Sequence, residues 1–414
     1  MRIECLRESE AKNIPLTSTQ AAALQDAGSR LASDKTYWGN VDHSEEPNPD
    51  RTVIECQQRV DGLWRVRVRE AIGLVVVDDL QIEVQPKIPL RHLLYLFERA
   101  EVIPRLDEQR GLAAQDESLL NLVVRWFLSQ LERILQRNLI RGYNERSEDL
   151  RVIRGRLRPI PTALAYYGGQ MEFPCDYEDY SPDMPLNRLL REAAHRVGRC
   201  SALAWPERRR AITAISRMGQ VGKLRPGDRN APIDRSSSHY RDAAILARNI
   251  LDGLDRLPQG GEHVAWTFLL RTPEAVEEGI RKILDESLGS RWAVTKKARQ
   301  VDGDSMSFNP DLVFNGGVAT GDVKYTIVSP QWRRQDIYQA IAFATIYRAR
   351  HAALIGFRRP GAIVPPNIRI GDMELQHMDW LADPTADPQQ SATMLADQVD
   401  RWLEKVVALH EVAA

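Results

Sequence analysis

Apolar and polar residues alternate with a period of two along four short stretches of the first hundred residues. These stretches are RTVIECQ, GLWRVRVRE, AIGLVVVD and LQIEVQP, and turn residues separate them. A period of two is typical of strands with one buried face. Helical spacing precedes them in STQAAALQDAGSRLASD and follows them in LRHLLYLFERA. The pattern predicts a mixed, β-rich N-terminal domain over residues 1–110, with antiparallel strands.

The middle of the chain changes to helical spacing. Residues 117–138, ESLLNLVVRWFLSQLERILQRN, are apolar around most of the circumference of a helix, which predicts a helix buried among others. Another helix is expected in CDYEDYSPDMPLNRLLREAAHRV. The segment RLPQGGEH at 256–263 breaks both periods and predicts a boundary there. We therefore expect a mostly helical middle region at 111–260 and a last domain at 261–414.

The last domain has an order of elements that can be followed residue by residue. TPEAVEEGIRKILDESLG predicts a helix with Thr272 as its cap, Pro273 in its first turn and Gly289 at its end. RWAVTKKARQV and SMSFNPDLVFN are strand-like, and the Asn315-Gly316-Gly317 hairpin signal leads to a third strand, VATGDVKYTIV. A helix in RQDIYQAIAFATIYRAR and an interior strand in HAALIGF follow. The predicted order is αβββαβ, and the predicted fold class is α+β and multidomain.

Composition limits the classes of function. The 414 residues are 43% hydrophobic with a formal net charge of -1, which argues against a protein that coats nucleic acid through bulk charge. Between residues 181 and 230, eleven basic residues face four acidic ones, a local surplus of 7. This segment includes Arg208, Arg209 and Arg210, near an expected helix start. Either phosphate contact or an ordinary solvated helix face explains it.

Other features of the composition favour an intracellular protein. No apolar run approaches the roughly 18 residues of a membrane span, and the N-terminus MRIECLRESEAKN lacks the apolar core of a signal peptide. The four cysteines are scattered without zinc or disulfide spacing, which predicts reduced and mostly buried thiols. We expect a cytoplasmic protein.

The stretch NPDLVFNGGVATGDVKYT at 309–326 carries the candidate chemistry. Side chains two apart on a strand point to one face, so Asp322 and Lys324 are expected to project together. Asp311, on the other strand of the hairpin, is expected beside Asp322. Two carboxylates this close repel each other unless a proton or a cation lies between them. Oxygen ligands at this density favour Mg²⁺, with Mn²⁺ as an alternative, and Lys324 would stabilise charge during phosphodiester cleavage.

The flanking helices offer further candidates. Glu277 is the expected third carboxylate because it borders the apolar face of its helix, and Glu278 is the alternative. Gln339, beside Tyr338 on the following helix, is expected to reach the same cleft, although both residues also fit an ordinary helix surface. The predicted metal ligands are Asp311, Asp322 and Glu277, with Lys324 and Gln339 completing the catalytic set.

Pro310-Asp311 and Asp322-Val323-Lys324, in this order of elements, resemble the PD-(D/E)xK nuclease superfamily. Four further segments resemble the McrC family, the nuclease subunits of McrBC restriction systems. They are IEVQPKIPLRHLLYLFERA at 82–100, DLRVIRGRLRPI at 149–160, CDYEDYSPDMPLNRLL at 175–190 and DIYQAIAFA at 336–344. Gly279 departs from the family pattern, which tends to carry a bulky residue there.

The resemblance implies an Mg²⁺-dependent DNA endonuclease of a type IV restriction system, which cuts modified double-stranded DNA such as 5-methylcytosine DNA in antiviral defence. It implies an AAA+ GTPase partner, a McrB-like hexamer, whose hydrolysis the N-terminal part of this chain stimulates. The chain has no nucleotide site of its own, because RMGQVGKLR carries Arg217 and Leu224 where a P-loop needs Gly and Ser or Thr. Two alternatives are a non-catalytic scaffold that activates the partner through a degenerate nuclease domain, and a stand-alone repair nuclease.

Overall fold

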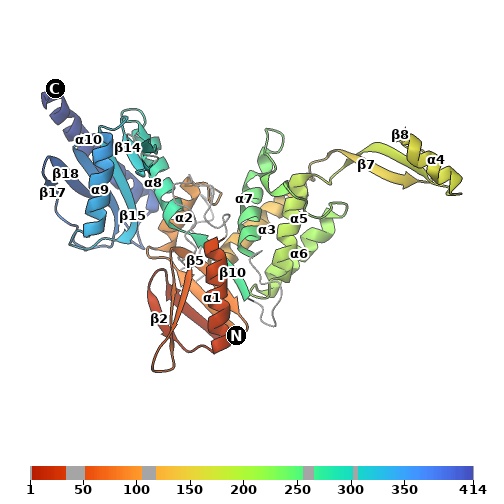
Figure 1. Cartoon of the computed structure of the whole chain (residues 1–414), viewed down its shortest axis with the longest axis horizontal. Helices are drawn as coiled ribbons and strands as arrows, with labels where there is room; N and C mark the ends of the chain where they lie inside the picture. The colour runs from red at the N-terminus through yellow and green to blue at the C-terminus, as the bar shows by residue number, and fades with distance from the viewer. Residues whose placement is uncertain (1, 34–51, 105–117, 255–264, 302–305, 414) are drawn as a thin grey trace. The chain divides into compact units, whose positions relative to one another are not determined.

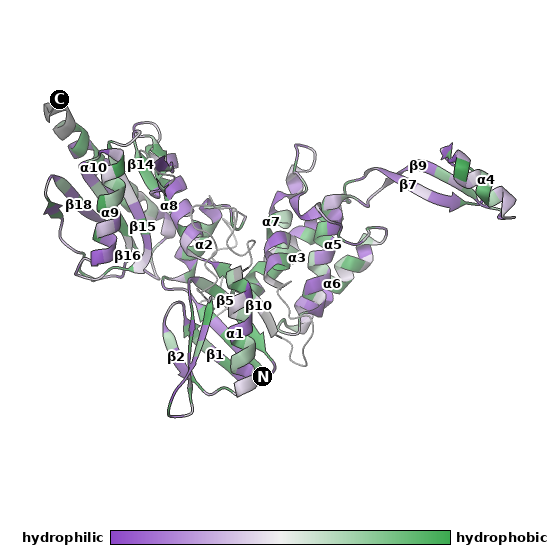
Figure 2. Ribbon diagram, in the orientation of Figure 1, coloured by the Kyte–Doolittle hydropathy of each residue, from purple (hydrophilic) through white to green (hydrophobic). Residues whose placement is uncertain are grey.

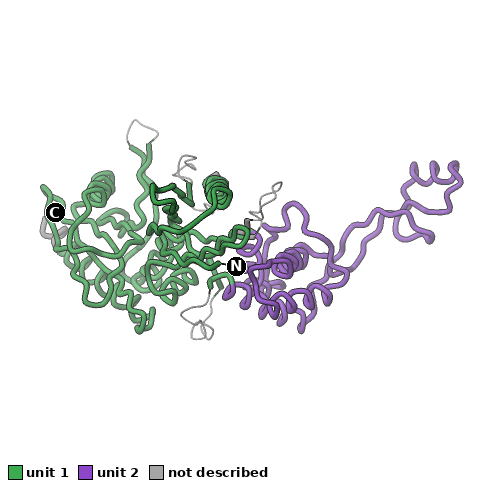
Figure 3. The backbone as a smooth tube through the Cα atoms, turned by 90° about the horizontal axis from the view of Figure 1, so that it is seen from below, with its two compact units in different colours: residues 1–120, 252–414 green, residues 121–251 purple. Residues whose placement is uncertain are grey.

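The computed structural model describes residues 2–33, 52–104, 118–254, 265–301 and 306–413. They form two compact units, which Figure 3 colours separately. Unit 1 comprises Met1–Leu120 and Asp252–Ala414, and unit 2 is Asn121–Leu251. The predicted ranges 1–110 and 261–414 therefore share one unit, and the boundary expected at 256–263 lies outside the described residues. Every helix in the described ranges is too short or too polar to cross a lipid bilayer.

The N-terminal part of unit 1 holds two small sheets and a helix, α1 (Ser18–Ser33), that share one core (Figure 1). The first sheet has the order β1 (Arg2–Arg7), β6 (Leu80–Gln85), β5 (Ala71–Val77), β10 (Ala265–Arg271). The second has the order β2 (Ala11–Ile14), β4 (Trp64–Val68), β3 (Ile54–Gln58). Strands β3 to β6 are the four that the alternation predicts, and α1 is the predicted helix.

Three strands of this region were not predicted. β1 runs parallel to β6, so the region is not purely antiparallel as expected. β2 is only four residues long, which is too short for a periodicity to emerge. β10 follows the predicted boundary, yet it pairs with β5 along seven residues. Gly73 permits this pairing, because its φ is +135° and a Cβ there would collide with the carbonyl of Phe268.

The C-terminal part of unit 1 is built on a six-stranded mixed sheet. Its order is β11 (Val294–Thr295), β14 (Leu312–Phe314), β15 (Ala319–Ile327), β16 (His351–Arg358), β18 (Met373–Leu381), β17 (Ile368–Ile370). β14 and β15 form the predicted antiparallel hairpin, and β16 lies inside the sheet as expected, parallel to β15 and β18. A separate two-stranded ribbon pairs β12 (Arg299–Gln300) with β13 (Ser307–Phe308). The predicted αβββαβ order ends at β16, so β17, β18 and a last helix extend it.

Helices cover both faces of this sheet. α9 (Arg334–Tyr347) packs in one core with Val313, whereas Trp402 of α10 (Pro388–Ala413) packs its ring on Phe314. Val313 and Phe314 are consecutive in β14, so their side chains point to opposite faces. α9 and α10 therefore lie on opposite faces of the sheet (Figure 1).

The helix α8 (Pro273–Leu288) forms where the sequence predicts it, with Pro273 in its first turn and Gly289 at its C-cap. Val276, Ile280, Ile283 and Leu284 are buried on one face, as expected. The predicted cap is wrong in one respect, because the Thr272 hydroxyl makes no capping bond and donates instead to the Glu8 carboxylate.

Gly279 lies where α8 packs on α2 (Leu90–Arg99), the helix predicted in LRHLLYLFERA. A Cβ at Gly279 would come within 2.6 Å of the Leu96 carbonyl oxygen. The close approach of the two helices therefore explains why a bulky residue is missing at this position.

Unit 2 is mostly helical, as predicted, and contains α3 (Leu119–Arg137), α5 (Pro185–Arg199), α6 (Trp205–Met218) and α7 (Arg241–Leu254). From these helices projects a long arm that the sequence did not predict (Figure 1). The arm pairs β7 (Gly142–Leu150) with β9 (Phe173–Ser181) and carries β8 (Arg156–Leu157) and α4 (Pro159–Tyr167) near its tip. No residue of β7 is buried, so the period-two signal of a half-buried strand is missing there.

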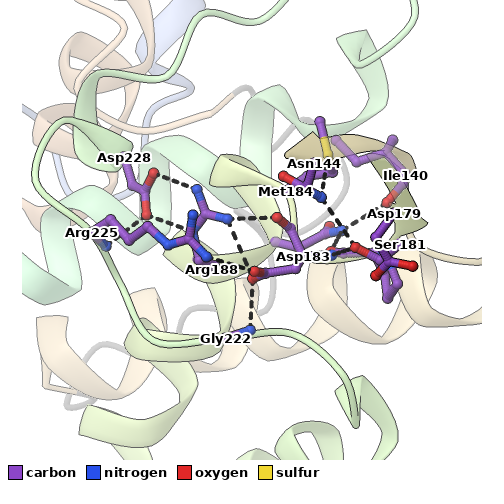
Figure 4. Close-up of polar contacts among 12 residues, drawn as sticks. Ile140, Asn144, Asp179, Ser181, Asp183, Met184, Arg188, Gly222, Arg225 and Asp228 are labelled. Carbon is purple, nitrogen blue, oxygen red and sulfur yellow. Dashed lines mark hydrogen bonds and ion pairs between the residues drawn. The ribbon is translucent and has the colours of Figure 1, made fainter. Parts of the chain in front are cut away.

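A buried ion-pair network lies at the base of the arm (Figure 4). Arg188 donates two bonds to the Asp228 carboxylate, at 2.8 and 2.9 Å, and Asp183 accepts from the Gly222 N–H and from Arg225, both at 2.8 Å. Burial raises the pKa of Asp183, but the Gly222 N–H and Arg188 outweigh it and lower the pKa overall. Part of the local arginine surplus is thus used inside the unit.

Candidate active site

The hairpin of β14 and β15 brings Asp311 and Asp322 together. The register pairs Leu312 with Gly321, so the next position outward sets Asp311 opposite Asp322. The Val323 N–H donates to Asp311 Oδ2 at 2.9 Å, which fixes that carboxylate against the neighbouring strand. Both side chains are buried. The placement expected from the hairpin is therefore observed.

Lys324 joins this pair from the same strand. Its Nζ lies 2.7 Å from Asp322 Oδ2, as the two-residue spacing predicts, and donates to Gln339 Oε1 of α9, also at 2.7 Å. Gln339 thus reaches the site as expected. Tyr338 is 67% exposed and shares none of these contacts, so an ordinary helix surface describes it.

The structure distinguishes Glu277 from Glu278. Glu277 approaches Asp311 closely enough for the two carboxylates to affect each other, and Lys296 Nζ lies 3.8 Å from Glu277 Oε2. Glu278 bonds instead to Arg281, whose Nε lies 3.0 Å away. Of the two glutamates, Glu277 is therefore the one beside the aspartates.

Burial and crowding shift the protonation of these groups. Burial, and then the Asp311 carboxylate, raise the pKa of Glu277, and the same two causes raise the pKa of Asp322. Burial alone would lower the pKa of Lys324, but the Asp322 carboxylate outweighs it and raises that pKa. Perturbed titration of several groups in one place is typical of functional sites.

The donor set suits a hard divalent cation, because it consists of carboxylate oxygens held near one another. In the described part of the chain, however, no three His, Cys, Asp or Glu side chains converge on one point. Two ammonium groups lie among the carboxylates instead, with Lys324 on Asp322 and Lys296 on Glu277 and Asp311. The residues fit a metal ion in chemistry and proximity once their side chains turn toward it.

Lys296 is the residue that the sequence reasoning missed. It follows β11 directly, and its Nζ lies 3.5 Å from Asp311 Oδ1. No spacing rule connects a lysine after a two-residue strand with a hairpin many residues later. A small cleft also borders Lys324 and is lined by Ser329, Arg333 and His377 among others.

A buried polar cluster supports the strand that carries Lys324. Lys87 donates to the Tyr325 carbonyl at 3.2 Å, and its Nζ lies 4.7 Å from the centre of the Tyr325 ring. The same Nζ lies 3.6 Å from Glu8 Oε1, and Thr272 also donates to the Glu8 carboxylate. The pairing of β15 with β16 is irregular between Val323 and Ile327. The Tyr325 carbonyl, which accepts the bond from Lys87, lies in this irregular part.

The arm of unit 2 exposes eight large apolar side chains at residues 152–173. Figure 2 colours parts of α4, in this segment, green for hydrophobic residues. We call this set the arm tip: Val152, Ile153, Ile160, Leu164, Tyr166, Tyr167, Met171 and Phe173. Contiguous exposed apolar surface on a protein usually marks a contact with a partner.

The arginines at the start of α6 are less available than the sequence suggested. Arg210 forms a bidentate pair with Glu132, with both bonds at 2.9 Å, and Arg208 donates to the Gly198 carbonyl at 3.3 Å. Arg209 is exposed. The phosphate-contact interpretation therefore applies to fewer side chains than the surplus of charge implies.

Comparison with known proteins gives a family match over residues 66–355, to the model of the McrBC 5-methylcytosine restriction system component. A search of curated proteins gives no match. One similar solved chain belongs to the Thermococcus gammatolerans assembly of McrB AAA+ hexamers with bound McrC. It has a TM-score of 0.71 at 14% identity, covering 97% of this chain and 100% of that chain. A chain of the Thermococcus gammatolerans McrBC complex has a TM-score of 0.48 at 16% identity, covering 69% of this chain and 88% of that chain.

Proposed function

Because the chain belongs to the family of McrBC 5-methylcytosine restriction system components, we propose that it is the McrC-like nuclease subunit of such a system. In this proposal it hydrolyses phosphodiester bonds of modified double-stranded DNA with Mg²⁺ and acts with a McrB-like AAA+ GTPase hexamer, whose hydrolysis it stimulates. The observation that carries the proposal is the grouping of Glu277 of α8, Asp311 next to β14, and Asp322 and Lys324 of β15.

Each member of the group has a role in the proposed reaction. Glu277, Asp311 and Asp322 would hold the metal ion, which when bound polarises the phosphoryl group and lowers the pKa of a water molecule. Lys324, oriented by Gln339, would stabilise the negative charge that develops on the phosphate. The exposed Arg333 lines the small cleft beside Lys324 and would add a second positive charge toward a phosphate group.

We assign the C-terminal part of unit 1 to the PD-(D/E)xK nuclease superfamily within this proposal. The supporting features are the order α8, β11, β14, β15, α9, β16 once the separate β12–β13 ribbon is set aside, and the position of the Asp and Asp-Val-Lys elements on the hairpin. The extra strands β17 and β18 and the helix α10 complete the sheet and cover it, and β18 adds His377 to the lining of the cleft beside Lys324.

The partner proposal rests on two observations. The solved chain with a TM-score of 0.71 comes from an assembly of McrB AAA+ hexamers with bound McrC. In this chain, the arm tip exposes apolar side chains that a partner would cover, since Tyr167 and Met171 are 87% and 88% exposed. We infer that the arm tip of unit 2 contacts the AAA+ ring.

The test is a cleavage assay with a McrB-like AAA+ GTPase, on methylated and unmodified duplex DNA with Mg²⁺. Asp322→Asn keeps the shape of the side chain but removes a charged ligand oxygen, so we expect cleavage to fall at least ~100-fold. Asp372→Asn, an exposed aspartate on the same part of the chain, is the matched control. Cleavage by Asp322→Asn at the wild-type rate would show that the site assignment is wrong.

The same assay tests the non-catalytic alternative. The absence of three converging ligands among the described residues is the observation that favours a scaffold. A wild-type protein that raises the partner's nucleotide hydrolysis but never cuts methylated DNA with Mg²⁺ or Mn²⁺ would establish that alternative instead.

A further inference from the structure

Lys296 lies inside the candidate site, whereas the next residue in the sequence, Lys297, does not. Its ammonium lies 3.5 Å from Asp311 Oδ1 and 3.8 Å from Glu277 Oε2, so it bridges carboxylates from two separate elements. The side chain is only 22% exposed, which means that the lysine is drawn into the site and does not extend into solvent. Lys297, the next residue, is exposed and its carbonyl accepts a bond from Tyr347.

The charges around Lys296 explain its position. Glu277, Asp311 and Asp322 supply three carboxylates within one site, and like charges at such distances repel strongly when they are shielded from water. Lys324 balances Asp322, to which it is paired at 2.7 Å. Lys296 balances the negative charge of Glu277 and Asp311 in the same way. Arg281 and Lys282 cannot do so, because they lie beside Glu278.

A divalent cation cannot simply be added to this arrangement. With all three carboxylates ionised, as metal ligands must be, the two ammonium groups leave one negative charge, and a bound Mg²⁺ would turn that into one positive charge. If Lys296 withdraws, the three carboxylates face Mg²⁺ and Lys324, and the charges balance. The space between Glu277 and Asp311 is also the place where their oxygens could meet on an ion.

We propose that Lys296 is a positioning residue that acts as the built-in counter-cation of the metal-free site, holding Glu277 and Asp311 together until a divalent cation displaces it. The inference rests on the proposed function, since it assumes that these carboxylates bind the metal. It assigns to Lys296 a role in metal affinity and in the stability of the metal-free protein.

The experiment measures thermal unfolding of the full-length protein against Mg²⁺ concentration at pH 8.5, where protons compete less with the metal. Lys296→Met removes the competing ammonium, so the metal-free protein should melt at a lower temperature. Its apparent Mg²⁺ affinity should rise roughly fivefold, the change that corresponds to an ion pair of ordinary strength. Lys296→Arg keeps a cation and should restore the metal-free melting temperature.

Two control variants make the result decisive. Lys297→Met should behave as wild type, because that side chain is outside the site. Asp322→Asn should lose most of the Mg²⁺-dependent shift, which identifies the shift with this site. If wild type and Asp322→Asn respond equally to Mg²⁺, the proposed metal site and the inference both fail. If wild type responds and Asp322→Asn does not, while Lys296→Met matches wild type or binds Mg²⁺ more weakly, only the role of Lys296 is overturned.

Discussion

Glu277 and Glu278 are consecutive residues of one helix with different environments. A rotation of about 100° per residue turns Glu277 toward the aspartates and Glu278 toward Arg281 and Lys282. Burial and Asp311 raise the pKa of the former, whereas the latter is paired with cations on its own helix. The helical rotation between two consecutive residues thus places Glu277 in a buried site beside another carboxylate and Glu278 in an ordinary surface ion pair.

The raised pKa of Glu277 makes the stability of the metal-free protein depend on pH. A carboxyl group whose pKa is higher in the folded state than the ordinary 4.5 binds more protons when folded, so stability falls as pH rises from about that value through the raised pKa. Glu277→Gln removes this loss. We expect the melting temperature of the variant, relative to wild type, to increase between pH 5 and pH 8.5 by a few degrees.

Glu278→Gln is the matched control for this measurement, because it changes the same side chain one position away. Its melting temperature relative to wild type should stay constant over the same pH range, apart from the small cost of a partly exposed ion pair. A pH-independent difference for Glu277→Gln, equal to that of the control, would contradict the assignment of Glu277 to the site.

Local rules were sufficient for the residues on the hairpin. The two-residue period placed Asp322 beside Lys324, and the Asn315-Gly316-Gly317 turn set Asp311 on the opposite strand. The contacts of Lys296 could not be predicted in this way, because they depend on how a short strand at the sheet edge is aligned. The roles of all these residues in catalysis stay predictions.

At the scale of elements, the strand that carries Lys324 depends on residues from the N-terminal part of unit 1. Lys87, just after β6, satisfies the Tyr325 carbonyl in the irregular part of β15 and lies beside the fully buried Glu8. Burial raises the pKa of Glu8, and Lys87 and Thr272 oppose that rise. Lys87 thus joins the N-terminal part of unit 1 to the strand that carries Lys324, while its ammonium also pairs with the buried Glu8.

A double-mutant cycle tests this joint. Lys87→Met leaves Glu8 buried without its cation, which should cost ~3 kcal/mol of unfolding free energy in urea. Glu8→Gln removes the buried charge and should cost less, and the double variant should recover part of the loss. Additive losses in the double variant, within about 0.5 kcal/mol, would show that the two residues do not act as a pair.

The elements that sequence patterns predicted share one property, which is a buried face. β3 and β4 combine buried and accessible residues, β5 is buried along its whole length and β6 along most of it, and α8 buries one helical stripe. The arm strands β7 and β9 are mostly accessible, and β10 pairs with a strand almost two hundred residues earlier in the chain. Neither an accessible ribbon nor a long-range pairing leaves a periodic signal in the local sequence.

At the scale of the whole molecule, the structure changes how the partner-contacting and nuclease functions should be separated. The boundary predicted at 256–263 would place a cut near residue 260 between the first and last domains. Such a cut removes β10 from the N-terminal sheet and leaves β5 with only one of its two antiparallel neighbours. Point substitutions in the full-length chain are therefore the sound way to separate the two functions.

The arm tip gives the variant that should lose the partner and keep the nuclease fold. Tyr166, Tyr167 and Met171 are each at least 80% exposed, and the two tyrosine rings contact each other edge-on, with their centres 5.9 Å apart. Changing all three to Ser should leave the melting temperature and its response to Mg²⁺ as in wild type. Stimulation of the AAA+ partner's nucleotide hydrolysis should fall at least ~10-fold, because exposed aromatic side chains commonly dominate binding energy at interfaces.

The control is Ile363→Ser, which changes an apolar side chain of unit 1 that is 70% exposed. This variant should stimulate hydrolysis as the wild type does. A triple variant that stimulates hydrolysis as well as this control would place the contact with the ring on another surface.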